Sequence, residues 1–393
     1  MIPIIYSALD TDLYKFTMQQ AIYHQFPSVN VEYRFKCRNK ADWTDEHINE
    51  INRRIDRLCA TVRFDAHTIN YLKSIRFFKQ DYLDFLSIFQ LNRDHIKVYL
   101  DDNRELQIEI AGSWLFTILF EVPILAIVNE VYFDQLEIEK YSVEGKKRLE
   151  QKIEMVRQFR DKNPGFVFAD FGTRRRFCFD WQQYVVRTLK EADIGMIGTS
   201  NVLFAYKYDI KPIGTMAHEW LQAGQALDVR LVDSQKRMLQ AWVDEYRGDL
   251  GIALTDVVGI DAFLRDFDLY FAKLYDGVRH DSGDPVVFAE KIINHYKNLR
   301  IDPKTKTIVF SDGLDFEKAF MLYEKFHDQI GVSFGIGTNL TNDVGVTPLQ
   351  IVLKMTECNG QPVAKISDSK GKGMCRDEGY LTYLKSVFHI EDK

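Results

Sequence analysis

Short apolar runs alternate with longer amphipathic stretches through the middle of the chain. Between residues 165 and 340, seven such runs end in small or polar residues, and most are followed by a helical pattern. They span residues 166–171, 194–198, 210–215, 250–256, 273–279, 307–311 and 332–337. The spacing between strand ends is mostly about 20–40 residues, which suits βα units. The pattern predicts an irregular (β/α) barrel of about seven parallel strands, with a doubly wound open sheet as the alternative.

Both ends of the chain carry a mixed α+β pattern. Residues 29–37 and 96–102 have the pattern of strands, and residues 45–62 that of a charged amphipathic helix. A second charged helix is expected at 143–162, leading into the barrel. Asn359-Gly360 separates two strand-like runs and is typical of a type I′ hairpin turn. We expect residues 1–140 and 346–393 to form an α+β sandwich-like domain, and residues 141–345 to form the barrel domain.

Composition narrows the possible partners. The 393 residues include 51 Lys+Arg and 57 Asp+Glu, for a net charge of −6, and 46% are hydrophobic. The apolar content excludes a disordered chain, and the acidic balance argues against nucleic-acid binding. An anionic ligand would therefore need positive charge that is concentrated locally.

The cysteines, the N-terminus and one apolar stretch predict a cytoplasmic protein without a membrane partner. Five cysteines at wide spacing are expected to be reduced thiols, and the N-terminus has no secretory signal pattern. Residues 111–128 imitate a membrane span, but Glu121 and Pro123 interrupt them. A buried helix ending near Pro123, followed by a second apolar segment, is the better interpretation.

Residues with useful chemistry follow the predicted strands, where barrel enzymes place their working groups. They are Arg174–Arg176, Thr199–Asn201, His218, Arg279–Asp284, Asp312–Gly313 and Gly337–Thr338. The arginines could form an anion site or an exposed helix start, and the second group could simply cap a helix. His218 could be catalytic or structural.

The remaining loops suit a phosphate-bearing substrate. Arg279 could bind a carboxylate, while Asp281 and Asp284 could hold sugar hydroxyls or hydrated Mg²⁺, or form only a turn with a helix cap. The glycines after the last strands would let backbone N–H groups approach a phosphate. The chain lacks a P-loop and a complete dinucleotide fingerprint, which disfavours kinases of that type and dehydrogenases.

Seven motifs, in order along the chain, carry a resemblance to a known family. They are TDLYKFTM (11–18), FGTRR (171–175), GTSN (198–201), GTMAHEW (214–220), RHDSGDP (279–285), FSDGLD (310–315) and FGIGTNL (334–340). The chain resembles nicotinate phosphoribosyltransferase, of the type II phosphoribosyltransferases. The resemblance implies transfer of phosphoribose from phosphoribosyl diphosphate (PRPP) to nicotinate. It further implies coupling to ATP as a co-substrate, Mg²⁺ as cofactor, and a homodimer with shared active sites.

The resemblance also implies roles for individual residues. His218 matches the phosphorylated histidine, and Asp281 the acidic residue near the ribose and metal. Nicotinate would meet Tyr14 (expected from the partner subunit), Phe171, Ser200, Thr215 and Arg279. PRPP would meet Arg38, Arg174, Asp312, Gly313, Gly337 and Thr338.

Position 200 separates close relatives. The nicotinamide-using cousin has an aspartate there, which would repel nicotinate, whereas Ser200 would not. The alternatives are a related transferase that uses nicotinamide or quinolinate, and a non-catalytic phosphosugar-binding barrel. Residues 367–376 depart from the family's basic C-terminal segment.

Overall fold

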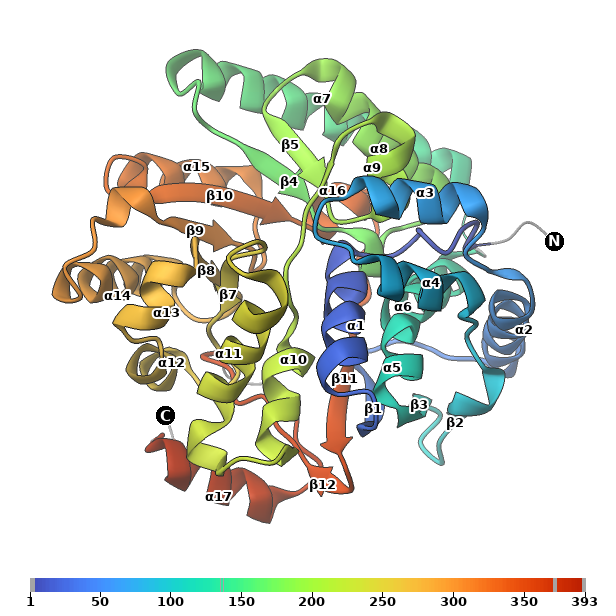
Figure 1. The fold of residues 1–393 in the computed structure, drawn as a ribbon. Helices are drawn as coiled ribbons and strands as arrows, with labels where there is room; N and C mark the ends of the chain where they lie inside the picture. The colour runs from blue at the N-terminus through green and yellow to red at the C-terminus, as the bar shows by residue number, and fades with distance from the viewer. Residues whose placement is uncertain (1–3, 135, 137, 370–372, 391–393) are drawn as a thin grey trace.

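The computed structural model describes residues 4–134, 136, 138–369 and 373–390. A curled parallel sheet forms one half of the molecule, with helices along its outer side (Figure 1). Its strands are β4 (Phe168–Asp170), β5 (Met196–Thr199), β6 (Lys211–Pro212), β7 (Ile252–Leu254), β8 (Gly277–His280), β9 (Thr307–Phe310) and β10 (Gly331–Ile336). All seven predicted strands are confirmed.

The strand order identifies an open barrel rather than a doubly wound sheet. The order is β6-β5-β4-β10-β9-β8-β7, which is the cyclic order of the chain interrupted between β6 and β7. Within the described residues no ladder joins these two strands, but the Thr215 hydroxyl donates to the Ile252 carbonyl at 2.8 Å. The seam of the barrel is thus held by a side chain next to the candidate site.

An antiparallel sheet lies beside the barrel and unites both ends of the chain. It contains β1 (Asn30–Cys37), β2 (Ile96–Leu100), β3 (Leu106–Ser113), β11 (Ile351–Cys358) and β12 (Gln361–Pro362), in the order β12-β11-β1-β3-β2. β11 pairs with β1 from Val31↔Cys358 to Cys37↔Ile351. Asn359 and Gly360 both have positive φ, 50° and 76°, which confirms the expected hairpin turn.

Helices cover both sheets. They are α1 (Leu13–Gln25), α2 (Asp45–Thr61), α3 (Ala66–Ser74), α4 (Gln80–Ile88), α5 (Trp114–Thr117), α6 (Glu121–Phe133), α7 (Ile138–Lys162), α8 (Phe179–Ala192), α9 (Val202–Tyr208), α10 (His218–Ala223), α11 (Ser234–Tyr246), α12 (Ile260–Asp266), α13 (Leu269–Leu274), α14 (Pro285–Asn298), α15 (Phe316–Phe326), α16 (Thr338–Thr341) and α17 (Glu378–Phe388). The predicted helices at 45–62 and 143–162 correspond to α2 and α7.

The apolar stretch that imitates a membrane span is an internal helical run. A 3-10 turn, Ile118–Phe120, separates α5 from α6, so the break falls just before Pro123 rather than at it. Pro123 lies in the first turn of α6, where a missing N–H breaks no helical bond. By length and composition Trp114–Phe133 could cross a membrane, but 89% of its most apolar window is buried inside the protein.

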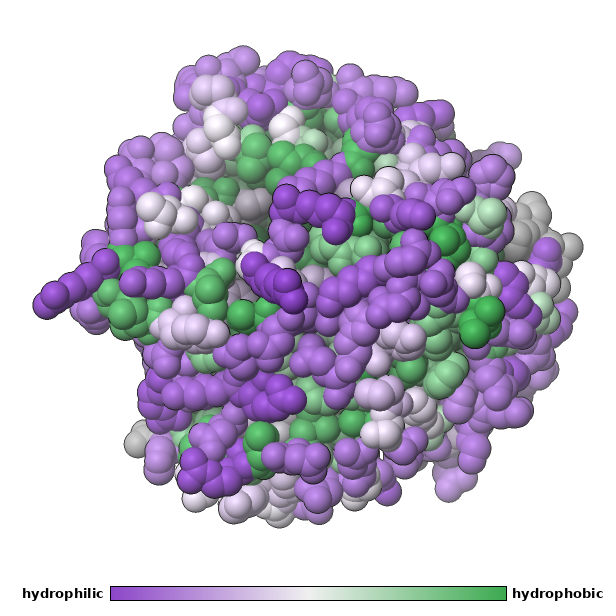
Figure 2. All heavy atoms as spheres, in the orientation of Figure 1, coloured by the Kyte–Doolittle hydropathy of each residue, from purple (hydrophilic) through white to green (hydrophobic). Residues whose placement is uncertain are grey.

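Hydrophilic residues cover most of the face in Figure 2, and hydrophobic ones form separate patches.

All five cysteines are free thiols, as expected. Three of them, Cys59, Cys178 and Cys358, are shielded enough for burial to raise the pKa of their thiols to about 11, 12 and 12. High thiol pKa values keep cysteines unreactive at neutral pH. These three residues are therefore packing groups rather than nucleophiles.

Candidate functional site

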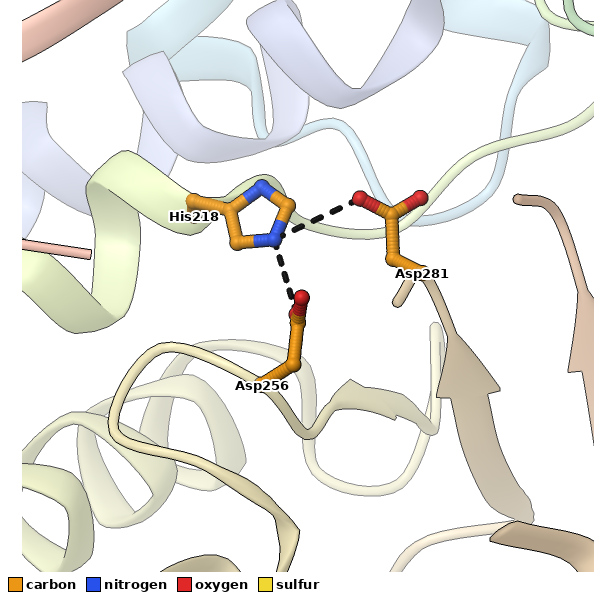
Figure 3. A group of neighbouring side chains, drawn as sticks. All are labelled: His218, Asp256 and Asp281. Atoms are coloured by element: carbon orange, nitrogen blue, oxygen red, sulfur yellow. Dashed lines mark hydrogen bonds and ion pairs between the residues drawn. The ribbon is translucent and has the colours of Figure 1, made fainter. Parts of the chain in front are cut away.

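His218 lies between two aspartates at the carboxyl ends of the barrel strands (Figure 3). It is the first residue of α10, whereas Asp256 follows β7 and Asp281 directly follows β8. Its Nε2 is 2.8 Å from Asp256 Oδ1 and 3.4 Å from Asp281 Oδ2. The structure thus brings together His218 and Asp281, and adds Asp256, which sequence reasoning missed.

Lys365 supplies a cation at the centre of this cluster. Its Nζ is 2.6 Å from His218 Nε2, 2.7 Å from Asp256 Oδ2 and 3.8 Å from Asp281 Oδ2, and its side chain is 3% exposed. The segment that carries it is held on the barrel by the Ile366 N–H, which donates to the Val257 carbonyl at 2.8 Å. The tail beyond β12 therefore completes a site that begins on the barrel.

The imidazole of His218 is neutral at pH 7. Burial, reinforced by the Lys365 ammonium, lowers the pKa of His218 to about 4. Burial favours the protonated form of Asp256, but the hydrogen bond with His218, the Lys365 ammonium and its hydrogen bond outweigh burial and hold the pKa of Asp256 well below its usual range. Since His218 is neutral, Lys365 is the cation that balances Asp256. Nε2 can donate to Asp256 or accept from Lys365, but not both, so the position of the ring proton decides its partner.

The histidine and two aspartates have ligand atoms within 4.8 Å of one another, which is close enough for a metal ion. As a group they do not suit Mg²⁺, because Mg²⁺ prefers oxygen ligands and the Lys365 ammonium already bonds two of the three side chains. Asp281 differs from the other two, because it is 25% exposed and its Oδ2 is 3.8 Å from Lys365 Nζ, beyond hydrogen-bond distance. Asp281 is the member that fits a hydrated ion bound to a phosphate.

Asp284, the other predicted Mg²⁺ or sugar ligand, is a helix cap instead. Its carboxylate accepts from the N–H groups of Val286 and Val287 at 2.8 and 2.9 Å, with Pro285 at the first helical position. This is a standard N-cap, and it explains the Asp-Pro pair without a ligand.

The three consecutive arginines have three different surroundings. Arg174 is 45% exposed at the site and donates to Glu121 at 3.1 Å. Arg175 donates from Nε to the Ile351 carbonyl at 3.0 Å, and burial, together with neighbouring Arg174 and Arg38, lowers its pKa to about 10. Arg176 is fully buried, so the suggested anion site of three arginines is wrong for this residue.

Three of the expected nicotinate residues, Tyr14, Ser200 and Thr215, lie near the ends of β5 and β6. The Leu13 N–H donates to the Ser200 carbonyl at 2.9 Å, and the Thr17 hydroxyl to the Thr215 carbonyl at 2.7 Å. These two bonds hold Tyr14, which lies between them in sequence, beside the barrel of its own chain. That Tyr14 also serves a partner subunit stays a prediction.

Ser200 already faces a carboxylate. Its hydroxyl donates to Asp12 Oδ1 at 2.7 Å, and burial raises the pKa of Asp12. Asp12 lies in the first motif of the resemblance but was not among the predicted site residues. It adds a buried acid at the position where the sequence suggested only a serine.

Phe171 directly follows β4, and Arg279 lies in β8, with β10 and β9 between these two strands in the sheet. The Phe171 N–H donates to the Ile336 carbonyl at 2.9 Å. The Phe171 ring packs directly on Gly335, so closely that a Cβ atom at position 335 would lie 2.3 Å from the ring. Arg279 Nη2 is 3.6 Å from Asp281 Oδ1, and its buried Nε has no hydrogen-bond partner among the described residues. Such an orphan donor suits an anionic ligand.

The predicted PRPP residues lie on adjacent loops. Gly313 has φ of 55°, Gly337 precedes α16, and Thr338 is its first residue. Arg38 follows β1. Burial lowers the pKa of its guanidinium, and the carboxylates of Asp312 and Asp281 oppose this. Arg38 therefore approaches the barrel loops from the antiparallel sheet.

Acidic and basic side chains thus meet between the carboxyl ends of an open α/β barrel and an adjoining sheet, which is the arrangement of an enzyme acting on an anionic substrate. Two family models match: the nicotinate phosphoribosyltransferase (NAPRTase) family over residues 166–392, and its N-terminal domain over residues 9–129. The chain belongs to the nicotinate phosphoribosyltransferase family.

Individual relatives match over the whole chain. It is 52% identical to a nicotinate phosphoribosyltransferase of Acinetobacter baumannii, covering 100% of this chain and 99% of the relative. A nicotinate phosphoribosyltransferase of Neisseria meningitidis is 53% identical, with 100% and 99% covered. The crystal structure of the enzyme of that name from Vibrio cholerae superimposes with a TM-score of 0.94 at 41% identity, covering 100% of this chain and 95% of the other. That from Porphyromonas gingivalis gives 0.90 at 35% identity, with 98% and 100% covered.

Proposed function

We propose that the protein transfers the phosphoribosyl group of PRPP to nicotinate and couples this transfer to ATP through phosphorylation of His218. The products are nicotinate mononucleotide and diphosphate, which makes the reaction a step of NAD salvage. Family membership supports the reaction. The observation that carries the role of His218 is its neutral imidazole, 2.6 Å from Lys365 and at the end of the barrel strands.

The transfer step needs no protein nucleophile. The bond from ribose C1′ to diphosphate breaks, diphosphate leaves with the electron pair, and the pyridine nitrogen forms the new bond to C1′. Arg174 and Arg38 would stabilise the charge of the leaving group, and Arg279 would bind the nicotinate carboxylate. Asp281 would hold Mg²⁺, which neutralises charge on the diphosphate.

The ATP step uses the lone pair of His218. The ring nitrogen that carries no proton attacks the γ-phosphorus, the bond to the ADP oxygen breaks, and ADP leaves. Water later cleaves the P–N bond and releases phosphate. Lys365 can pair with the new phosphoryl group, because its ammonium already lies within hydrogen-bond distance of Nε2. Phosphorylation therefore redistributes charge around Asp256 and Asp281.

The test is a product assay with labelled ATP. Wild type is expected to form nicotinate mononucleotide from nicotinate, PRPP and Mg²⁺, faster with ATP, and to carry phosphate on His218. His218→Ala is expected to lose the label and the ATP effect but to retain slow transfer. The matched control is His327→Ala, because His327 is an exposed histidine that directly follows α15, and this variant should behave as wild type. Full ATP stimulation in His218→Ala would refute the phosphohistidine.

We also propose the two-domain division at residues 1–140 with 346–393, and 141–345. The pairing of β11 with β1 supports it, because a C-terminal strand completes the N-terminal sheet. The homodimer with shared sites and the cytoplasmic location stay predictions.

A further inference from the structure

A fully buried lysine lies between two carboxylates behind the proposed active site. Lys15, on α1, is 0% exposed; its Nζ is 2.6 Å from Glu121 Oε2 and also bonds Glu219 Oε1. At one end, Glu121 accepts from Arg174 at 3.1 Å. At the other, the Tyr33 hydroxyl donates to Glu219 Oε2 at 2.5 Å. Glu219, Lys15, Glu121 and Arg174 thus form a row of charges that alternate in sign, buried except at Arg174, which we name the charge row.

One end of the charge row adjoins the proposed phosphorylated histidine, and the other end is a proposed PRPP ligand. Glu219 directly follows His218 in α10, so its position and that of the imidazole share one backbone turn. Arg174 is the proposed PRPP ligand and the only member that is 45% exposed. Lys15 directly follows Tyr14, the proposed stacking residue. The charge row therefore connects the ATP-responsive histidine with the PRPP arginine through protein interior.

The two carboxylates do not share the cations equally. Glu121 contacts both Lys15 and Arg174, and these cations overcome burial to hold the pKa of Glu121 below its usual range. Among the described residues the Glu219 carboxylate bonds Lys15 and the Tyr33 hydroxyl alone, and burial raises the pKa of Glu219. If Arg174 turned toward a phosphate, Glu121 would depend on Lys15 alone, and the bond from Lys15 to Glu219 would weaken. In the low-dielectric interior such an exchange of partners changes the ion-pair energies more than it would in water.

We propose that Lys15 is a positioning residue that couples the state of His218 to the affinity of Arg174 for PRPP. This inference rests on the proposed function and deepens it. Phosphorylation of His218 shifts the first turn of α10 and with it Glu219, and Lys15 passes the change to Glu121 and Arg174. By reciprocity, PRPP bound at Arg174 changes the equilibrium constant for phosphorylation of His218 by the same factor by which phosphorylation changes the affinity for PRPP.

The experiment compares Lys15→Met with wild type in two readouts: the KM for PRPP with and without ATP, and labelling of His218 by ATP. Methionine keeps the length and apolar stem of lysine but removes the charge. We expect Lys15→Met to be labelled at His218 while the ATP effect on the KM for PRPP shrinks by at least about fivefold. Lys306→Met is the matched control, because Lys306 is also a buried lysine. It directly precedes β9 and donates to the Tyr275 carbonyl at 2.6 Å, outside the charge row.

Outcomes separate this inference from the proposed function. Wild type without product or without an ATP effect would overturn both. A Lys15→Met enzyme that is labelled and keeps the full ATP effect would overturn the inference alone. If Lys15→Met fails to fold, Glu121→Gln gives the same decision, since it keeps the shape and a hydrogen bond but removes the charge between Lys15 and Arg174.

Discussion

Replacing Arg176 with methionine separates a structural arginine from its two neighbours. Its Nη1 and Nη2 contact the Asp10 carboxylate at 2.7 and 2.9 Å, and its Nε contacts Glu130 at 2.8 Å. The side chains of Arg176 and Asp10 are both 0% exposed. Removing one partner of a buried ion pair costs about 3–5 kcal/mol.

Two features place Arg176→Met near the lower end of this range. Burial already raises the pKa of Glu130 to about 7, so Glu130 can take up a proton when the guanidinium is lost. Asp10 keeps one donor, the Asn201 side-chain amide at 2.8 Å. We therefore expect the free energy of unfolding to fall by ~3 kcal/mol, measured by urea denaturation with tryptophan fluorescence.

Arg174→Met is the matched control, since it makes the same replacement two residues earlier on an arginine that is 45% exposed. Its ion pair is screened by solvent and should contribute ~1 kcal/mol or less to stability. We expect Arg174→Met to raise the KM for PRPP without unfolding the protein. If instead Arg176→Met keeps wild-type stability and Arg174→Met loses it, the structural assignment of the two arginines is refuted.

Two further predictions concern a pH-dependent contact and substrate choice. The hydrogen bond to Glu245 raises the pKa of His24 in the folded protein. The contact between protonated His24 and Glu245 therefore stabilises the fold fully below pH ~6.5, the usual histidine pKa, and this contribution is lost as pH rises through the raised folded-state pKa. Thermal unfolding should therefore show His24→Gln destabilising the protein more at pH 6 than at pH 9; equal losses would contradict this. Ser200→Asp places a second carboxylate beside Asp12, 2.7 Å from the present hydroxyl, and should shift the kcat/KM ratio from nicotinate toward nicotinamide, whereas an unchanged ratio would argue against a role of Ser200 in selection.

The barrel could be predicted in part because some of its strands are buried on both faces. β4, for example, reads Phe-Ala-Asp with all three residues buried, and such strands appear in sequence as short apolar runs without alternation. Asn359-Gly360 was equally informative, since few residue pairs adopt two successive positive φ angles. Local sequence therefore sufficed where local burial or backbone geometry decided the structure.

The central cation of the site could not be predicted in this way. Lys365 lies 147 residues from His218 in sequence, and the surrounding Val-Ala-Lys-Ile carries no sign of a catalytic partner. Asp256 did carry a signal, because it ends the fourth apolar run in the position where the other runs end in candidate residues. Its partners, His218 and Lys365, come from other loops, and only the closed barrel brings them together.

The three consecutive arginines show why composition alone could not locate the positive charge. In sequence Arg174, Arg175 and Arg176 are equivalent, yet the first faces the site, the second bonds a carbonyl of β11, and the third is neutralised by Asp10 and Glu130. A 3-10 turn turns each residue about a third of a revolution from the last, so neighbours point in different directions. Further basic groups of the candidate site come from distant segments, Arg38 after β1 and Lys365 beyond β12. In a protein of net charge −6, the two anionic substrates of the proposed function would thus depend on cations that tertiary structure, rather than local sequence, brings together.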